Sequence, residues 1–122
     1  MKAKILVVDD TALSRMGTAI TVKALGFATD EAASGPEALD RVGSCHYALI
    51  LMDYNMWQMD GIECTQKIRA LESKTGTRVP IVALTSSNEM EIREKCLQAG
   101  MDDYLDKSYS PEELQEILAK WL

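Results

Sequence analysis

Short apolar runs alternate with longer amphipathic segments along the whole chain, a pattern typical of strands that alternate with helices. The apolar runs predict strands at residues 4–8, 27–31, 47–52, 81–85 and 103–105. The segments between them predict helices at residues 12–25, 34–43, 60–71, 89–99 and 110–121. No repeat, low-complexity tract or linker interrupts this alternation, so we expect one domain over residues 1–122.

The predicted helices carry local signals at their ends and along one side. Gly26 and Gly100 follow two of them, and glycine adopts the left-handed backbone of a helix C-terminus at little cost. Ser34 and Ser110 open two others, each with a proline in the first turn and a glutamate three residues on, which is a capping signature. Apolar residues at helical spacing support the helical assignment of three segments. They are Leu13, Met16, Ile20 and Ala24 in the first helix, Cys64, Ile68 and Leu71 on one stripe of the third, and Leu114, Ile117, Leu118 and Trp121, which mark the buried face of the last.

The strands predicted at residues 4–8, 47–52 and 81–85 are apolar throughout, which indicates burial on both faces. Strands that alternate with helices are joined by right-handed crossovers, so they form a parallel sheet with helices on both faces. The predicted fold class is therefore α/β, a doubly wound parallel sheet. Ligands of such sheets bind outside the carboxyl ends of the strands, so polar residues at those ends are the candidates for a site.

Five polar residues fall at carboxyl ends of predicted strands: Asp9, Asp10, Asp53, Thr85 and Lys107. Clustered carboxylates repel, by about 4 kcal/mol for two unit charges roughly 4 Å apart at an effective dielectric near 20. Lys107 offers one counter-charge, and carboxylate oxygens suit Mg²⁺ for the remainder. Taken singly, each aspartate is more often a turn former or helix cap, and the lysine is more often solvated. Their joint placement is what indicates a site.

Composition and charge narrow the function classes. Hydrophobic residues at 47% and charged residues at 26% are typical of a globular domain. The net charge of −6 argues against binding to nucleic acid or anionic membranes, which requires a basic surface. The apolar runs are too short for a membrane span or a signal peptide. The odd number and wide spacing of Cys45, Cys64 and Cys96 fit reduced thiols in a cytosolic protein, and the single histidine, His46, argues against a Ser-His or Cys-His nucleophile.

Five segments resemble the response-regulator receiver domain of two-component signalling, and together they span essentially the whole chain. They are ILVVDD (5–10), LILMDYNM (49–56), MDGIE (59–63), PIVALTS (80–86) and AGMDDYLDK (99–107). The stretches MDGIECTQKIRALE and REKCLQAGMDDYLDK are most similar to receivers of hybrid sensor kinases and phosphorelays. The resemblance implies a flavodoxin-like (βα)5 fold whose five-stranded parallel sheet has the order 2-1-3-4-5.

The resemblance also implies roles for matching residues. Asp53 is the expected phosphoacceptor, and Lys107 is expected to pair with it and then with the phosphoryl group. Asp9, Asp10, Asp53 and the backbone carbonyl of Asn55 are expected to hold Mg²⁺, Asp10 directly and Asp9 largely through water.

Two further residues are implied to transmit the signal. Thr85 is expected to donate its hydroxyl to a phosphoryl oxygen, and Tyr104 to turn inward once Thr85 has moved. An acyl phosphate adds charge and acceptor oxygens to a rim that is already acidic, so donors must be repositioned and the population shifts between two states.

The implied partner is a sensor histidine kinase or a histidine-phosphotransfer domain that carries a phosphohistidine. Docking is expected around Asp53 and at the exposed start of the first helix, near Ala12, Leu13 and Met16. We expect a cytoplasmic domain, free or as the cytoplasmic portion of a membrane-bound hybrid kinase, which is a monomer or a weak dimer that forms on phosphorylation. Its catalysis is expected to be limited to its own phosphorylation and slow dephosphorylation.

The chain departs from the family at two positions where receivers usually carry proline. Trp57 follows Met56, which suggests a loop that is shaped for a partner, that shields Asp53, or that has simply drifted at the surface. Ser108 follows Lys107, and a cis bond before serine costs roughly 3–4 kcal/mol, against about 0.5–1 before proline. We therefore expect either a trans bond with a rearranged loop or local strain, with Lys107 still reaching Asp53 from a more mobile loop.

Two alternatives from other classes stay open. A Mg²⁺-dependent phosphohydrolase with an aspartyl nucleophile would use the same Asp, Lys and Thr chemistry. It usually needs an acid two residues after the nucleophile, where this chain has Asn55. A pseudo-receiver that acts through protein contacts alone is favoured weakly by Ser108, and the intact acidic residues argue against it.

Overall fold

Five parallel strands form one sheet in the order β2-β1-β3-β4-β5, as the resemblance implied. The computed structural model describes residues 3–86 and 90–122. The strands are β1 (Lys4–Val8), β2 (Ala28–Ala32), β3 (Leu49–Asp53), β4 (Ile81–Thr85) and β5 (Asp103–Asp106). The helices are α1 (Ala12–Ala24), α2 (Gly35–Ser44), α3 (Gly61–Thr75), α4 (Met90–Ala99) and α5 (Pro111–Trp121).

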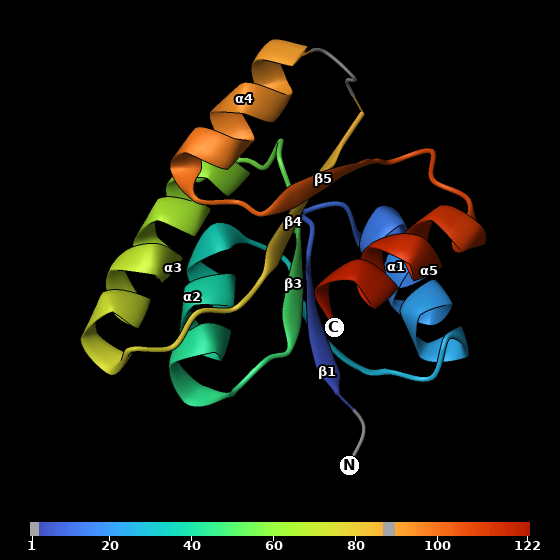
Figure 1. The fold of residues 1–122 in the computed structure, drawn as a ribbon, viewed down its shortest axis with the longest axis horizontal. Coiled ribbons are helices and arrows are strands. Elements are labelled where there is room, and N and C mark those ends of the chain that lie inside the picture. Colours follow the sequence, from blue (N-terminus) through green and yellow to red (C-terminus); the bar gives the residue numbers. More distant parts are fainter. Residues whose placement is uncertain (1–2, 87–89) are drawn as a thin grey trace.

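The helices cover both faces of the sheet, with α1 and α5 on one face and α2, α3 and α4 on the other (Figure 1). The central strands β1, β3 and β4 are almost wholly buried, while the edge strands β2 and β5 are half-buried. Successive residues of a strand point to opposite faces, so Ile5 and Val7 join the core under α1 and α5 while Leu6 and Val8 join the core under the other three helices. The continuous apolar runs of the sequence therefore contribute side chains to two cores, one on each face of the sheet.

The observed element bounds lie within two residues of the predicted ones, except that α3 continues to Thr75, four residues beyond the predicted end. Strand β2 begins one residue later than predicted, β3 begins two residues later and extends to Asp53, and β5 extends to Asp106. Helix α4 begins at Met90, and its predicted start, Glu89, lies outside the described residues. The capping signatures hold, because Ser34 accepts the amide hydrogen of Glu37, and Ser110 and Glu113 form a reciprocal capping box.

Helix α1 carries its larger apolar residues on the side away from the sheet. Leu13, Met16 and Ile20 are exposed by 82%, 51% and 64%, and the helix instead buries Thr18, Ala19 and Val22. Two sides of this helix carry apolar residues at helical spacing, and the side with the smaller residues lets the helix lie close to the sheet. The larger residues therefore form an exposed apolar surface, as the expected docking at the start of this helix requires. In α3, Leu71 is likewise 40% exposed, whereas Cys64 and Ile68 are buried.

The loop after β5 keeps Lys107 in place without a cis peptide bond; none occurs among the described residues. The backbone N–H and the hydroxyl of Ser108 both donate to Asp106 Oδ1, each at 2.8 Å. The Tyr109 hydroxyl is 2.9 Å from Thr18 Oγ1 and ties the loop to α1. The trans alternative is therefore the one observed, and serine contributes two donors that a proline would lack.

Asp103 anchors the end of α5 to the start of β5 and makes stability depend on pH. Burial works to raise the pKa of Asp103, but hydrogen bonds from the Trp121 indole, the Tyr104 amide and the Lys120 ammonium outweigh burial and lower this pKa. A carboxylate with a lowered pKa stabilises the fold above its unfolded pKa and loses that contribution as the pH falls through its folded pKa.

We expect Asp103→Asn to lower the free energy of unfolding by about 1 kcal/mol at pH 7. The difference from the wild type should shrink as the pH falls below about 3.9, the ordinary aspartate pKa. Urea denaturation at a series of pH values measures both quantities. A difference that is independent of pH would contradict this explanation.

Within the described residues, none of the helices is both long enough and apolar enough to span a bilayer.

Candidate functional site

Three aspartates converge at the carboxyl end of the sheet. Strands β1 and β3 pair in parallel with Val8 opposite Met52, so the residues that follow Val8 lie beside Asp53. Carboxylate oxygens of Asp9, Asp10 and Asp53 all lie within 4.8 Å of one another. Asp9 and Asp53 are buried, and Asp10 is exposed. The sequence prediction that these carboxylates share one site is confirmed in its geometry.

Asp9 is held from several directions in the buried part of the cluster. Its Oδ1 accepts the Thr11 amide hydrogen at 2.9 Å, and its Oδ2 accepts the Ser14 hydroxyl at 2.6 Å. The Lys107 ammonium lies 3.5 Å from the same Oδ2. Asp9 thus bonds the backbone just ahead of α1, which fixes its orientation toward the cluster.

Asp53 has two carboxylate oxygens with different surroundings. Its Oδ1 lies 3.1 Å from Lys107 Nζ and accepts the Asn55 amide hydrogen at 3.3 Å. Its Oδ2 is buried and has no hydrogen-bond partner within the part of the chain that the structure describes. Burial raises the pKa of Asp53 to about 6, although Lys107 acts in the opposite direction. One oxygen is therefore positioned by donors, and the other is left for a ligand.

Lys107 bridges the two buried carboxylates. Burial would lower the pKa of Lys107, but Asp53 and Asp9 outweigh burial and raise this pKa above its ordinary value. The lysine therefore stays charged and offsets part of the mutual repulsion of the aspartates. The expectation that Lys107 reaches Asp53 is confirmed, and the expected mobility of its loop remains a prediction.

The remaining predicted residues lie close to the cluster in the fold. Thr85 is buried at the carboxyl end of β4, one residue beyond Leu84, the register partner of Asp53. Tyr104 on β5 is half-buried, and the Arg93 guanidinium lies 5.3 Å from its ring centroid. The positions of both fit the roles that the resemblance implied, and the roles themselves remain predictions.

Gly61 lets α3 begin directly beside Asp53. Its amide donates to the Tyr54 carbonyl at 3.0 Å, and a Cβ at this position would come 2.5 Å from the carbonyl oxygen of Asp53. Any larger residue would displace the backbone that carries the aspartate. Asp60 caps the helix by accepting the Glu63 amide hydrogen.

The residues of the cluster fit a hard divalent cation. Three carboxylates within 4.8 Å offer the oxygen ligands that Mg²⁺ prefers. The buried Oδ2 of Asp53, which lacks a partner among the described residues, would gain one. A buried carboxylate oxygen without a partner is costly, so binding of a cation would relieve an unfavourable feature of the site.

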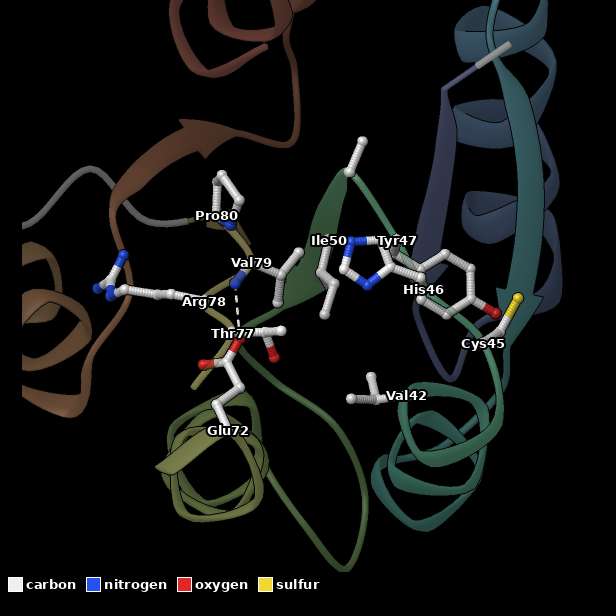
Figure 2. A pocket seen from close by; sticks show the side chains of 11 residues that line it. Val42, Cys45, His46, Tyr47, Ile50, Glu72, Thr77, Arg78, Val79 and Pro80 are labelled. Carbon is white, nitrogen blue, oxygen red and sulfur yellow. Dashed lines mark hydrogen bonds between the residues drawn. The ribbon is translucent and has the colours of Figure 1, made fainter. Parts of the chain in front are cut away.

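A cavity of about 200 Å³ lies at the opposite end of the strands from the three aspartates, near the amino ends of β3 and β4 (Figure 2). His46, Tyr47, Ile50, Glu72 and Val79 are among the residues that line it. It contains none of the three clustered aspartates, so it is separate from the candidate site. His46 is exposed, as expected of a lone surface histidine.

Comparison with known proteins decides the family. The response regulator receiver domain profile matches residues 5–119. The chain belongs to the receiver-domain family. This receiver domain is 36% identical to the hybrid signal transduction protein dokA of Dictyostelium discoideum over 121 residues, which covers 99% of the chain and 7% of dokA. It therefore spans only a small part of that relative's length.

Two solved structures show the same fold. The receiver domain is 38% identical, with a TM-score of 0.89, to the receiver of a Pseudomonas aeruginosa sensor histidine kinase, a structure with magnesium coordinated in its active-site cleft. That match covers 99% of this chain and 98% of the other. The receiver domain is also 28% identical, with a TM-score of 0.92, to a chain in the Saccharomyces cerevisiae co-crystal structure of the phosphotransfer protein Ypd1 with the receiver of Ssk1. This second match covers 98% of this chain and 88% of the other. The chain is thus a two-component signalling domain.

Sequence reasoning missed two groups that position the aspartates of this receiver domain. Ser14 bonds Asp9 from the first turn of α1, and its spacing of five residues carries no recognisable signal. The backbone amide of Trp57 donates to Asp10 Oδ2 at 2.9 Å. Because the second donor is a main-chain group, no side-chain type could have revealed it.

Proposed function

We propose that Asp53 accepts a phosphoryl group from a phosphohistidine on a partner protein. The observation that carries the proposal is the asymmetric environment of its carboxylate, with Oδ1 held by Lys107 and Asn55 and Oδ2 buried without a partner among the described residues. The two donors orient the carboxylate that acts as the nucleophile.

The proposed reaction is a single phosphoryl transfer. A carboxylate oxygen of Asp53 forms a bond to phosphorus while the phosphorus–nitrogen bond of the phosphohistidine breaks, and the departing imidazole takes up a proton. The product is an acyl phosphate. Charge spreads over the equatorial oxygens in the loose transition state, and the Lys107 ammonium, 3.1 Å from Asp53, lies where it can stabilise that charge.

We propose that Asp9, Asp10, Asp53 and the backbone carbonyl of Asn55 hold Mg²⁺, in line with the fit of the carboxylate cluster. A divalent cation bound there would neutralise phosphoryl oxygens during transfer. Ser14 and Lys107 hold Asp9, and the Trp57 amide holds Asp10, so the ligands are positioned by groups of this chain.

The proposed response to phosphorylation runs through Thr85 and Tyr104. The new phosphoryl oxygens need donors, and Thr85 lies at the end of β4 beside the strand that carries Asp53. A shift of Thr85 would change the space beside β5, where Tyr104 is half-buried. The outcome is a shift in population between two conformations.

The exposed apolar surface of α1 is the proposed docking site for the phosphodonor. Leu13, Met16 and Ile20 are exposed on the helix that follows Asp9 and Asp10. The Ypd1–Ssk1 structure joins a phosphotransfer protein to a receiver domain. We expect Leu13→Lys to slow phosphorylation by a phosphohistidine protein at least about tenfold, and to leave the rate with acetyl phosphate unchanged. Equal slowing with both donors would contradict docking at this surface.

We infer that residues 1–122 act as one unit in the cytoplasm, free or as part of a longer hybrid kinase. The three free cysteines support a reducing setting. We further infer a monomer, or a weak dimer after phosphorylation, whose catalysis is confined to its own phosphorylation and slow dephosphorylation.

Incubation with acetyl phosphate and MgCl₂ separates the proposed function from its alternatives. Intact-mass measurement should show one added phosphoryl group, which is lost in Asp53→Asn and prevented by EDTA. Steady turnover of phosphomonoesters would favour a phosphohydrolase instead, although Asn55 stands where such an enzyme needs an acid. No mass gain at any Mg²⁺ concentration would favour a pseudo-receiver.

A further inference from the structure

The β3–α3 loop reaches back to the acidic cluster through a main-chain group. The amide N–H of Trp57 donates to Asp10 Oδ2 at 2.9 Å, across 47 positions of the sequence. Trp57 as a residue is 77% exposed. We propose that the Trp57 amide is a positioning group that holds Asp10 ready to bind the divalent cation, an inference that rests on the proposed function.

Asp10 needs such a group more than its neighbours do. Asp9 and Asp53 are buried, and Lys107 forms ion pairs with both of them. Asp10 is exposed, and its carboxylate lies within 4.8 Å of two other carboxylates that repel it. An exposed side chain under repulsion turns toward water unless a donor holds it. The Trp57 amide is that donor, so the ligand cluster is assembled before a cation arrives.

The loop is built to point this amide inward. Met56 and Met59 on either side of Trp57 are buried in the core under α2, α3 and α4. Gln58 has a left-handed backbone with φ of 68°, and the Met59 amide donates to the Trp57 carbonyl at 2.8 Å. The two methionines thus anchor a tight turn whose tip exposes the indole and directs the amide to Asp10. A proline at position 57 has no amide hydrogen and could not form this bond.

Two variants separate the amide from the indole. Trp57→Ala removes the indole and keeps the amide, whereas Trp57→Pro removes both. We expect the Kd for Mg²⁺, measured by titrating MgCl₂ into ¹⁵N-labelled protein, to stay within about twofold of wild type in Trp57→Ala. In Trp57→Pro the Kd should rise about three- to tenfold, the usual net effect of one lost hydrogen bond at an exposed site. The rate of phosphorylation at subsaturating Mg²⁺ should fall in parallel.

Each other outcome overturns the inference in a distinct way. Equal Kd values in all three proteins would show that the amide does not position Asp10, and the proposed function would stand. An equal loss of affinity in both variants would assign the effect to the indole. If the wild type shows no Mg²⁺-dependent shift, the metal site of the proposed function fails and the inference fails with it.

A second measurement keeps the inference testable if Trp57→Pro does not fold. In metal-free Asp10→Ala the amide proton of Trp57 loses its acceptor, so its resonance should move upfield by more than that of Gln58. Amide hydrogen exchange at Trp57 should also quicken in Asp10→Ala. Unchanged shift and exchange would contradict the hydrogen bond on which the inference depends.

Discussion

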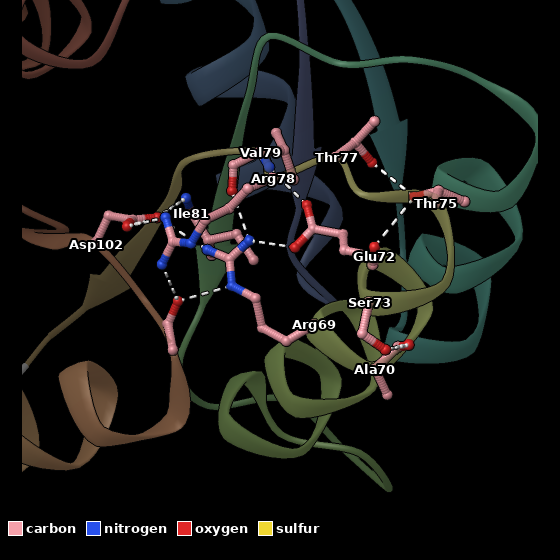
Figure 3. A network of polar contacts seen from close by, with 11 residues as sticks. Arg69, Ala70, Glu72, Ser73, Thr75, Thr77, Arg78, Val79, Ile81 and Asp102 are labelled. Carbon is pink, nitrogen blue, oxygen red and sulfur yellow. Dashed lines mark hydrogen bonds and ion pairs between the residues drawn. The ribbon is translucent and has the colours of Figure 1, made fainter.

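Replacement of Arg69 by methionine is expected to lower the free energy of unfolding by about 3–5 kcal/mol, the cost of breaking a buried ion pair by removing one partner. The Arg69 guanidinium bonds Glu72 and Asp102, and also the carbonyls of Gly100 and Val79 (Figure 3). The side chains of Glu72 and Asp102 are only 9% and 8% exposed. Without Arg69, two buried carboxylates lose a cation that joins α3 to the starts of β4 and β5.

Arg78 supplies a matched control for this prediction. Its guanidinium also bonds Asp102, but its side chain is 57% exposed. Arg78→Met should therefore cost at most about 1 kcal/mol, as exposed ion pairs do. Urea denaturation of the two variants measures the contrast. Equal destabilisation would show that burial of the Arg69 network is not what makes it stabilising.

Replacement of Lys107 by methionine is expected to slow phosphorylation of Asp53 by acetyl phosphate about 10²-fold or more, the usual effect of losing one preorganised charge donor. Lys107 lies 3.1 Å from Asp53 Oδ1 and 3.5 Å from Asp9 Oδ2, so the variant loses the cation that both buried carboxylates contact. Methionine keeps most of the length of the side chain and removes the charge. Time-resolved intact-mass measurement at saturating Mg²⁺ gives the rate.

Lys120 provides the control lysine. It pairs with Asp103 at the start of β5, which is the amino end of the strand and lies away from the aspartate cluster. The Lys120 side chain is 63% exposed. Lys120→Met should leave the phosphorylation rate within about twofold of wild type, because the charge it removes is remote from the developing phosphoryl charge. A Lys107→Met rate within threefold of wild type would contradict the role proposed for Lys107.

The placement of the site followed from sequence because topology alone determines it. Parallel strands bring their carboxyl ends to one edge, so Asp9, Asp10, Asp53 and Thr85 had to gather there once their strands were recognised. The buried strands were predictable for the same reason, since continuous apolar runs fit only the centre of a sheet with helices on both faces.

Other features depend on packing that periodicity does not encode. Helix α1 has apolar residues on two sides, and the choice of Ala19 and Val22 over Leu13 and Ile20 depends on how closely the helix can approach the sheet. The hold on Asp10 comes from a main-chain amide, whose direction is set by a turn and not by a residue type. The role of Ser108 was also not predictable from its residue type. Its amide and hydroxyl both donate to Asp106, and these bonds depend on the conformation of the loop.

The most direct test of the central claim is to locate the phosphoryl group. After incubation with acetyl phosphate and Mg²⁺, reduction with borohydride converts an aspartyl phosphate to homoserine, and peptide mass spectrometry identifies the position. We predict homoserine at position 53 alone, and none in Asp53→Asn. Homoserine at Asp9 or Asp10, or phosphorylated protein in which position 53 is unmodified, would contradict the assignment of Asp53 as the phosphoacceptor.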